Sequence, residues 1–476
     1  MTSDDLTTPI ACTLLLYVVV SYALAWRFSR KIESREDYLV AGRRLPLPLA
    51  SATLLATWFG AGTLLTAADE VRDVGLRAIA LEPLGAALCL LIAGIWVARP
   101  LWEMKLETLG DFFRERFGGT VELWASLAMV PGYFGWIAVQ LVALAEVIHL
   151  MIGIPPAWGI ALVAVVGTGY TLLGGMWAVT VTDAVQLSLL AIGLVLLTFQ
   201  VLAFLGNGAP LDGLAALGDR LPAEALEPVP TKTTSELVSW LGVLAVASLG
   251  NLPGQDLTQR IFAARSASVA RQACLLAGVG YLVLGAMPVL LGLAARIMSP
   301  AEDAIVPALA RATMSPATAT VFVVAITGAV LSTIDSAILA PAGVLSKNVL
   351  PRVVDVAPLT LDRLCVLGVA VASLAVAYLG ESAYTLLEQA YGLGLMALFV
   401  PLVVGLRDAA PDEVACLAAL AVGATSWLVH VLFGMKSFLE PWLAPHGWSV
   451  PAPVATVALA WIVYRVVAWR RSRGSS

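Results

Sequence analysis

Charged residues, histidines and paired cysteines are scarce in this chain of 476 residues. Asp, Glu, Lys and Arg together make up only 13% of it, and there are 3 histidines. Soluble globular proteins are roughly a quarter charged, so a soluble fold is excluded. The 5 cysteines lie apart in apolar stretches, without the spacing of a disulfide framework or a zinc site. We interpret them as small buried hydrophobic residues.

The short motifs of several enzyme classes are missing as well. The chain has no G-x-x-x-x-G-K-[ST] loop, which argues against a self-contained ATP-driven pump. It has no H-E-x-x-H helix, and its histidines (His149, His430 and His446) are dispersed. We therefore expect a protein that is not an enzyme. We also expect a lipid bilayer and a small solute as its partners, and no nucleic acid.

Long apolar runs dominate what is present. The composition is 59% hydrophobic, with a mean hydropathy of +0.88. Runs of about 20 residues recur along the chain, each long enough to cross a bilayer as a helix. They are continuous rather than alternating, which favours helices over a barrel. We expect an all-α polytopic membrane protein with about thirteen transmembrane helices. These lie near 8–28, 47–70, 76–99, 120–150, 156–174, 179–205, 233–260, 268–297, 318–347, 360–380, 383–407, 412–433 and 451–470.

Basic residues lie on one side of this topology. They concentrate within 27–44, 99–116, 260–271 and 347–363, at Arg407, and in the tail at 470–473. By the positive-inside rule these segments face the cytoplasm. An odd number of spans then places the N-terminus outside and the C-terminus inside, in a plasma (inner) membrane. The acidic start, 1–8, lacks a basic region, so the first apolar run is expected to be a retained helix.

Two spans are interrupted in their middle. The second reads ATWFGAGTLL and the seventh reads ASLGNLPGQDLTQR, which clusters glycine and proline around Asn251. Broken backbone at membrane depth is tolerated where it lines a cavity, and such pairs indicate a transporter's central site. The alternative is a pair of ordinary kinks, since Gly and Pro are common in membrane helices. Arg260, which follows the second break, is expected at an inner gate or at lipid headgroups.

The stretch Val330 to Ser346, VLSTIDSAILAPAGVLS, carries polar residues in an apolar helix. Ser332, Asp335 and Ser336 stand at i, i+3 and i+4 and so share one helical face. An acid at membrane depth suggests an ion or substrate path. The other interpretation is a polar stripe that hydrogen-bonds neighbouring helices.

Four motifs resemble the sodium/solute symporter family. They are DYLVAGRRL (37–45), YTLLGGMWAVTVTDAVQ (170–186), GNLPGQDLTQRIFAARS (250–266) and LSTIDSAILAPAGVLSKNVL (331–350). The stretches ATWFGAGT, GNLPGQ and STIDSA look most similar to its choline-transporting branch, except that Gly254 stands where that branch carries tryptophan. The resemblance implies a leucine-transporter-type fold with two inverted five-helix repeats. The repeats would be 47–205 and 233–407, with an extra N-terminal helix at 8–28 and two C-terminal helices at 412–470.

The same resemblance implies sodium as the coupling ion. Its ligands would be the carbonyl groups of Ala56 and Phe59 and the hydroxyl groups of Ser332 and Thr333. A possible second site would combine Asp183 with Ser332, Asp335 and Ser336. A proton shared between Asp183 and Asp335 is the alternative, because two close carboxylates tend to hold one proton between them.

The substrate is expected between the two breaks, near the bilayer midplane. Acids at membrane depth and aromatic side chains favour a cationic or amine-bearing solute such as choline. Amino acid, sugar and monocarboxylate remain open, as do proton coupling and a solute-sensing role. The candidate lining residues are Trp58, Thr63, Glu82, Tyr133, Trp136, Gln140, Asn251, Gln255, Glu388 and Tyr391.

Overall fold

The computed structural model describes residues 4–299, 304–380, 391–435, 437–440 and 450–474. Within these ranges the regular structure is helical, with one isolated bridge between Leu45 and Ala264 and no strand. The predicted all-α class is therefore confirmed.

The helices of the first half precede the loop at 206–233. Their bounds are α1 (Asp4–Ser29), α2 (Arg35–Val40), α3 (Leu47–Trp58), α4 (Ala67–Val74), α5 (Leu84–Ile92), α6 (Ala98–Glu103), α7 (Leu109–Phe117), α8 (Gly119–Ile152) and α9 (Pro156–Leu205), with the short α10 (Pro210–Arg220) inside the loop. Those of the second half are α11 (Thr234–Gly250), α12 (Gln255–Ala263), α13 (Ala267–Met298), α14 (Ile305–Thr313), α15 (Pro316–Val344), α16 (Pro358–Ala377), α18 (Phe399–Arg407), α19 (Glu413–Phe433) and α21 (Ala452–Gly474).

Both predicted breaks are present. The α3 helix ends at Trp58, and Phe59 has a non-helical ψ of 60° before a π-helical turn, Gly62–Thr66, leads into α4. The second break separates α11 from α12, whose axes are bent by 41°. Pro253 lies in this break and cannot donate a backbone hydrogen bond, so it helps to stop α11.

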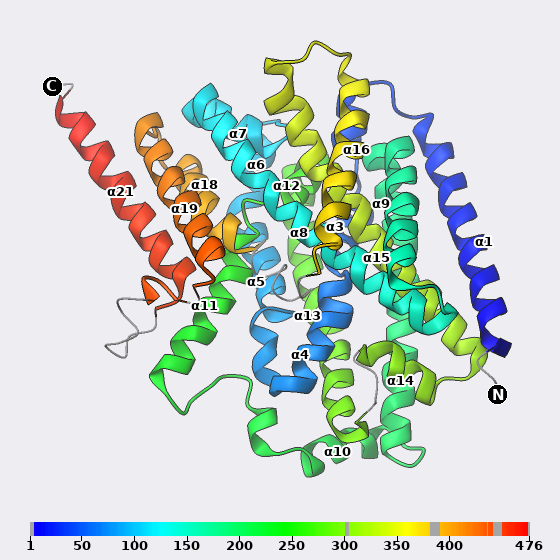
Figure 1. Ribbon diagram of the computed structural model, residues 1–476. Helices are drawn as coiled ribbons and strands as arrows, with labels where there is room; N and C mark the ends of the chain where they lie inside the picture. The colour runs from blue at the N-terminus through cyan, green and yellow to red at the C-terminus, as the bar shows by residue number, and fades with distance from the viewer. Residues whose placement is uncertain (1–3, 300–303, 381–390, 436, 441–449, 475–476) are drawn as a thin grey trace.

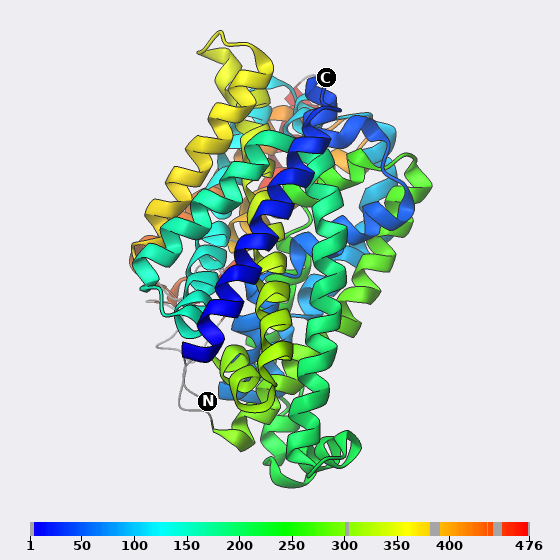
Figure 2. The ribbon, with the colours of Figure 1, turned by 90° about the vertical axis from the view of Figure 1, so that its right-hand side faces the viewer.

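The α9 helix contains a sharp turn at Gly175, where φ is +48°. L-residues with a side chain rarely adopt this conformation, so glycine suits the position. The chain reverses there, and the arms 156–174 and 176–205 correspond to two of the expected spans (Figure 2).

In the described ranges, nine helical stretches are long and apolar enough to span a membrane, or ten with the bent α11–α12 pair. Two of them, Gly62–Glu103 and Pro156–Leu205, each cover parts of two expected spans. Leu47–Trp58 and Tyr391–Arg407 are shorter apolar helices. A polytopic membrane protein is thus confirmed, whereas thirteen crossings and the two inverted repeats stay predictions.

The α15 helix lies at the centre of the bundle. In the most apolar 18 residues of the stretch that contains α15, 78% are buried, whereas the corresponding parts of α1 and α21 are each 22% buried. Figure 1 shows α1 and α21 at opposite edges, and Figure 2 shows α1 lying across the outside of the bundle, where it contacts α9 and α15. The two termini lie at opposite ends of the molecule, as an odd number of crossings requires.

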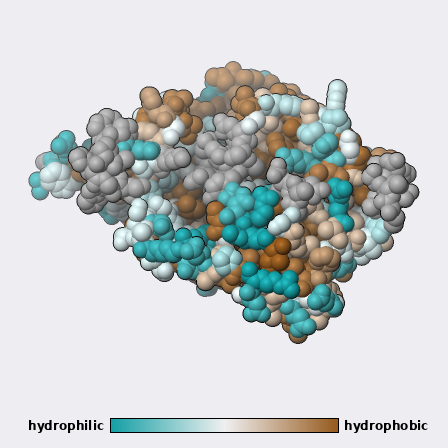
Figure 3. Space-filling model, turned by 60° about the horizontal axis from the view of Figure 1, so that its bottom comes forward, coloured by the Kyte–Doolittle hydropathy of each residue, from teal (hydrophilic) through white to brown (hydrophobic). Residues whose placement is uncertain are grey.

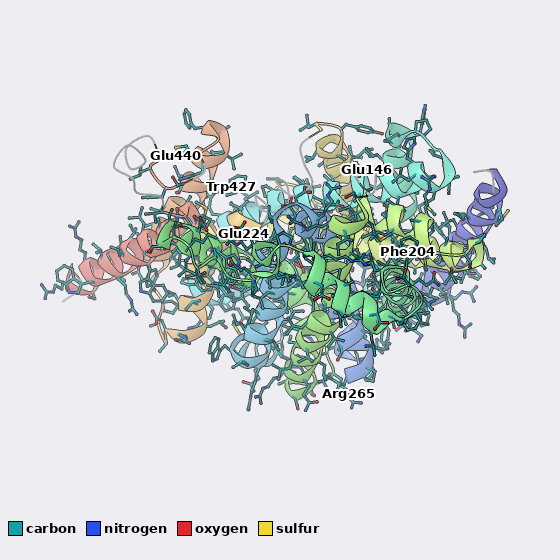
Figure 4. All side chains as sticks on the ribbon, turned by 90° about the horizontal axis from the view of Figure 1, so that it is seen from below. Glu146, Phe204, Glu224, Arg265, Trp427 and Glu440 are labelled. Atoms are coloured by element: carbon teal, nitrogen blue, oxygen red, sulfur yellow. The ribbon has the colours of Figure 1, made fainter. Side chains whose placement is uncertain are left out.

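The end of the molecule that carries the N-terminus is crossed by the loop between α10 and α11 (Figure 1). Glu224 lies on this loop, and Phe204 lies near the end of α9 (Figure 4). Figure 3 shows hydrophilic residues gathered on this face, next to hydrophobic ones. Arg77 forms an ion pair with Glu227 of the loop at 2.8 Å and another with Glu236, in the first turn of α11, at 3.3 Å.

Candidate functional site

The end of α3 meets the middle of α15 through backbone and hydroxyl oxygens. The Thr333 hydroxyl group lies 3.4 Å from the Ala56 carbonyl oxygen and 3.3 Å from that of Ala329. A Cβ atom on Gly60 would come within 2.5 Å of the Thr333 hydroxyl oxygen, so only glycine allows this close approach. The arrangement brings together Ala56 and Thr333, two of the predicted sodium ligands, next to the broken backbone at Phe59.

Ser332, the neighbour of Thr333, points to a different partner. Its hydroxyl group donates to Asp183 Oδ1 at 2.5 Å, and Thr53 donates to Asp183 Oδ2 at 2.5 Å. Both oxygens of this fully buried carboxylate therefore accept hydrogen bonds from hydroxyl groups. The two hydroxyl groups of the first predicted sodium site therefore have different partners. Ser332 donates to Asp183, whereas Thr333 lies beside the Ala56 carbonyl oxygen.

The second predicted set is brought together, with a buried arginine among it. Arg260 donates to the Ser336 hydroxyl group, which in turn donates to Asp335 Oδ1 at 3.1 Å. Its guanidinium group also lies 3.9 Å from Asp183 Oδ2, and its Nε donates to the Thr53 hydroxyl group at 3.2 Å. Arg260 is 1% exposed.

Sequence interpretation placed Arg260 at a gate or at lipid headgroups and did not connect it with these acids. A usable signal was the presence of one basic and two acidic residues at membrane depth, which generally pair with one another. When both acids are ionised, Asp183, Asp335 and Arg260 together leave one negative charge. A single bound cation or proton would neutralise it.

A cavity lies beside the break between α11 and α12. Its walls come from the middle of α8, from the break itself and from the helical segment around Tyr391. The lining residues are Ala128, Met129, Gly132, Tyr133, Trp136, Gly250, Asn251, Pro253, Gly254, Asp256, Tyr391, Leu393, Gly394 and Leu398. They include four predicted residues, namely Tyr133, Trp136, Asn251 and Tyr391.

The acid in the cavity wall is Asp256, which sequence interpretation missed. Trp58 Nε1 donates to its Oδ2 at 2.6 Å, and the Tyr133 hydroxyl group donates to its Oδ1 at 2.6 Å. The backbone N–H of Asp256 donates to the same Tyr133 oxygen at 3.0 Å. Trp58 thereby links the end of α3 to the start of α12.

Glu82 lies behind Tyr391 and is 4% exposed. Its Oε2 accepts hydrogen bonds from Thr63 at 2.9 Å and from Tyr281 at 2.7 Å, and its Oε1 accepts one from Tyr391 at 3.2 Å. Tyr281 was not anticipated; its hydroxyl oxygen also lies 2.9 Å from the Trp58 carbonyl oxygen. Among the described residues, no lysine or arginine forms an ion pair with Glu82.

The remaining predicted lining residues lie elsewhere. Gln140 Oε1 accepts from the backbone N–H of Ala61 at 2.7 Å, which places it at the α3 break. Gln255 Oε1 accepts from the backbone N–H of Leu109 at 2.6 Å, so this side chain is directed at α7 rather than at the cavity. Glu388 lies outside the described residues.

Comparison with known proteins gives a consistent family match. Residues 38–410 match the model of the sodium:solute symporter family. The human high affinity choline transporter 1 is 31% identical over 286 residues, which cover 58% of this chain and 48% of the relative. The Torpedo marmorata high-affinity choline transporter 1 is 27% identical over 359 residues, or 70% and 60% of the two chains. The chain thus matches about half the length of these curated relatives.

Solved structures resemble the fold over nearly the whole chain. A Na+-coupled sialic acid symporter, described in a substrate-bound outward-open state, matches with a TM-score of 0.79 at 18% identity and covers 97% of both chains. A nucleobase-cation-symport-1 family transporter matches with a TM-score of 0.60 at 15% identity, covering 92% of this chain and 96% of that one.

Proposed function

The chain belongs to the sodium:solute symporter family, and from this premise we propose that it is a sodium-coupled symporter. It imports a small organic solute by alternating access between the two sides of the membrane. The solute is cationic or amine-bearing, as choline is. In the proposed orientation the N-terminus is outside and the C-terminus is in the cytoplasm.

The observation that carries this proposal is the position of Thr333 beside the broken end of α3. Its hydroxyl group lies 3.4 Å from the Ala56 carbonyl oxygen, where the helix stops and backbone oxygens become available. Hard cations take oxygen ligands of these kinds. Unwound carbonyl groups at such breaks coordinate sodium in transporters. We assign the first sodium to Ala56, Phe59, Ser332 and Thr333.

A second coupling ion is supported by the cluster around Arg260. Asp183, Ser332, Asp335 and Ser336 converge there, and their charges sum to one negative charge with Arg260 included. A second sodium ion could occupy this position. Because Arg260 already compensates one carboxylate, a proton shared by the two acids is the competing assignment.

A cationic solute is supported by the acids at the cavity. Asp256 lines the cavity and Glu82 lies behind Tyr391, with neutral donors around each. Trp136 and Tyr133 add aromatic faces, which attract cations through their ring quadrupoles. The relatives named choline transporters are consistent with this assignment. Amino acid, sugar and monocarboxylate are the alternative solutes.

Uptake into proteoliposomes tests the proposal. We expect radiolabelled choline, or another small amine, to accumulate when an inward sodium gradient is imposed, and an inward current to accompany it. Equal uptake in sodium and in potassium buffer, with only pH having an effect, would remove the sodium assignment. Binding of an uncharged or anionic solute in place of any amine would remove the cationic one.

A further inference from the structure

Asp256 lines the cavity at the point where α12 begins. It is the second residue of α12 and is 5% exposed. The N-terminal end of a helix carries a partial positive charge, which favours a negative side chain there. The fold therefore supports an anion at this position.

The Asp256 carboxylate has room at its present position because residue 254 is a glycine. A Cβ atom at Gly254 would come within 2.8 Å of Asp256 Oδ1 and within 2.9 Å of the Asn251 carbonyl oxygen. Both distances are shorter than normal contacts, and the second partner is backbone that cannot move away easily. A residue larger than glycine would thus displace the carboxylate from its present position.

The partners of the carboxylate orient it without neutralising it. Trp58 and Tyr133 each donate one hydrogen bond to a separate oxygen, and both groups are neutral. No lysine or arginine of the described ranges forms an ion pair with Asp256. A carboxylate has about four acceptor positions, so lone pairs remain for a further donor. A buried charge without a counter-charge is costly, and a cationic ligand would remove that cost.

We infer that Asp256 is the anionic anchor for the solute, and that the cationic group of the solute carries at least one N–H. The solute class is then a protonated amine or a guanidinium compound rather than a quaternary ammonium ion. An N–H donor forms a charge-assisted hydrogen bond with a carboxylate, which is about twice as strong as a neutral one. A quaternary ammonium ion has no such donor and depends on aromatic faces. This inference rests on the proposed function.

Two amines that differ by one methyl group provide the test. Choline and N,N-dimethylethanolamine are of similar size and both are cations at neutral pH, but only the second has an N–H. Binding of each to the purified full-length protein is measured in sodium buffer. We expect dimethylethanolamine to bind at least about tenfold more tightly. In Asp256→Asn we expect its affinity to fall by about tenfold or more and the preference over choline to disappear.

Asp212→Asn is the matched control, since Asp212 is an exposed acid in the first turn of α10. It should leave both affinities unchanged. The comparison of the two amines in the unmodified protein needs no variant, so poor folding of Asp256→Asn does not prevent a decision.

Other outcomes would overturn the inference. Choline binding as tightly as dimethylethanolamine would overturn it while leaving a cationic symporter intact. Loss of sodium binding in Asp256→Asn, with amine selectivity unchanged, would assign the carboxylate to a cation site instead. Binding of neither amine would overturn both this inference and the cationic solute of the proposed function.

Discussion

Two groups of buried acids in this protein differ in whether a resident cation accompanies them. The Arg260 cluster, which comprises Asp183, Asp335 and Arg260 with Ser332 and Ser336, contains its own guanidinium group. The cavity acids are Asp256, which lines the cavity, and Glu82, which hydrogen-bonds the lining residue Tyr391. They have tryptophan, tyrosine and threonine donors, and no lysine or arginine forms an ion pair with them in the described part of the chain. In the first group Arg260 compensates one of the two carboxylates, whereas the second group has no protein cation and depends on a bound solute for its counter-charge.

This difference separates acids that a protein cation compensates in part from acids that only a bound solute can compensate. Removing one member of a buried ion pair leaves the other as an uncompensated buried charge. Substitutions in the Arg260 cluster should therefore lower the free energy of unfolding. Removing a cavity acid should instead alter the affinity for a cation.

Arg260→Met should destabilise the protein by about 3–5 kcal/mol, because it leaves two buried carboxylates without a counter-charge. Thermal or chemical unfolding of the purified protein measures this change. Arg265→Met is the control; Arg265 is exposed, and Figure 4 shows it at the edge of the bundle. Equal stability of the two variants would show that the cluster does not depend on its arginine.

Thr333→Ala should raise the sodium concentration for half-maximal uptake by about tenfold or more, since it removes a hydroxyl ligand at the α3 break. Thr327→Ala, on the same helix, removes a buried hydroxyl group for which no hydrogen-bond partner is found in the described residues. The control should retain normal sodium dependence. If both variants responded alike, the effect would come from packing of α15 rather than from an ion ligand.

Glu82→Gln should weaken the binding of a cationic solute by up to about tenfold, with little change in sodium dependence. The neutral amide keeps the shape of the side chain but removes its charge. Glu122 is a buried glutamate that Arg352 already pairs with at 2.8 Å, so Glu122→Gln should affect stability and not solute affinity. Binding titrations together with unfolding curves distinguish the two responses. A reversed pattern would contradict the difference between the Arg260 cluster and the cavity acids.

Asp111→Asn should cost only about 1 kcal/mol, because the Lys347 and Asp111 side chains are 26% and 15% exposed and solvent weakens their ion pair. Burial of Asp111 works to raise its pKa, but Lys347 at 2.9 Å and Asn348 at 3.0 Å together lower the pKa below its ordinary value. A lowered pKa stabilises the fold above the ordinary carboxyl range, and that contribution is lost as the pH falls through the lowered value. Unfolding measured across acidic pH should show a smaller pH dependence in Asp111→Asn. An unchanged pH profile would exclude Asp111 as a contributor.

The breaks in α3 and α11–α12 could be predicted because glycine and proline act locally on the backbone. The shared face of Ser332, Asp335 and Ser336 followed from helical periodicity alone. Such features need no knowledge of the partner helices.

The polar partners on α12 could not be predicted in the same way. Adjacent helical residues point about 100° apart, so the rotation of α12 after its bend decides whether Gln255 or Asp256 faces the cavity. The sequence pattern does not set that rotation. Asp256 and Arg260 stand four residues apart on α12, and Arg260 donates to the Asp256 carbonyl oxygen at 3.0 Å. The cluster and the cavity are therefore positioned by one short helix.

The hydrogen bond from Trp58 to Asp256 has a thermodynamic consequence. Trp58 is the last residue of α3 and lies between Ala56 and Phe59, whose carbonyl groups are assigned to sodium. An ion that orders this end of α3 also orders the indole that holds the solute's anchor. By thermodynamic linkage, if the ion raises the affinity for the solute, the solute must raise the affinity for the ion by the same factor. A single side chain would in this way make the cargo and its driving ion bind cooperatively.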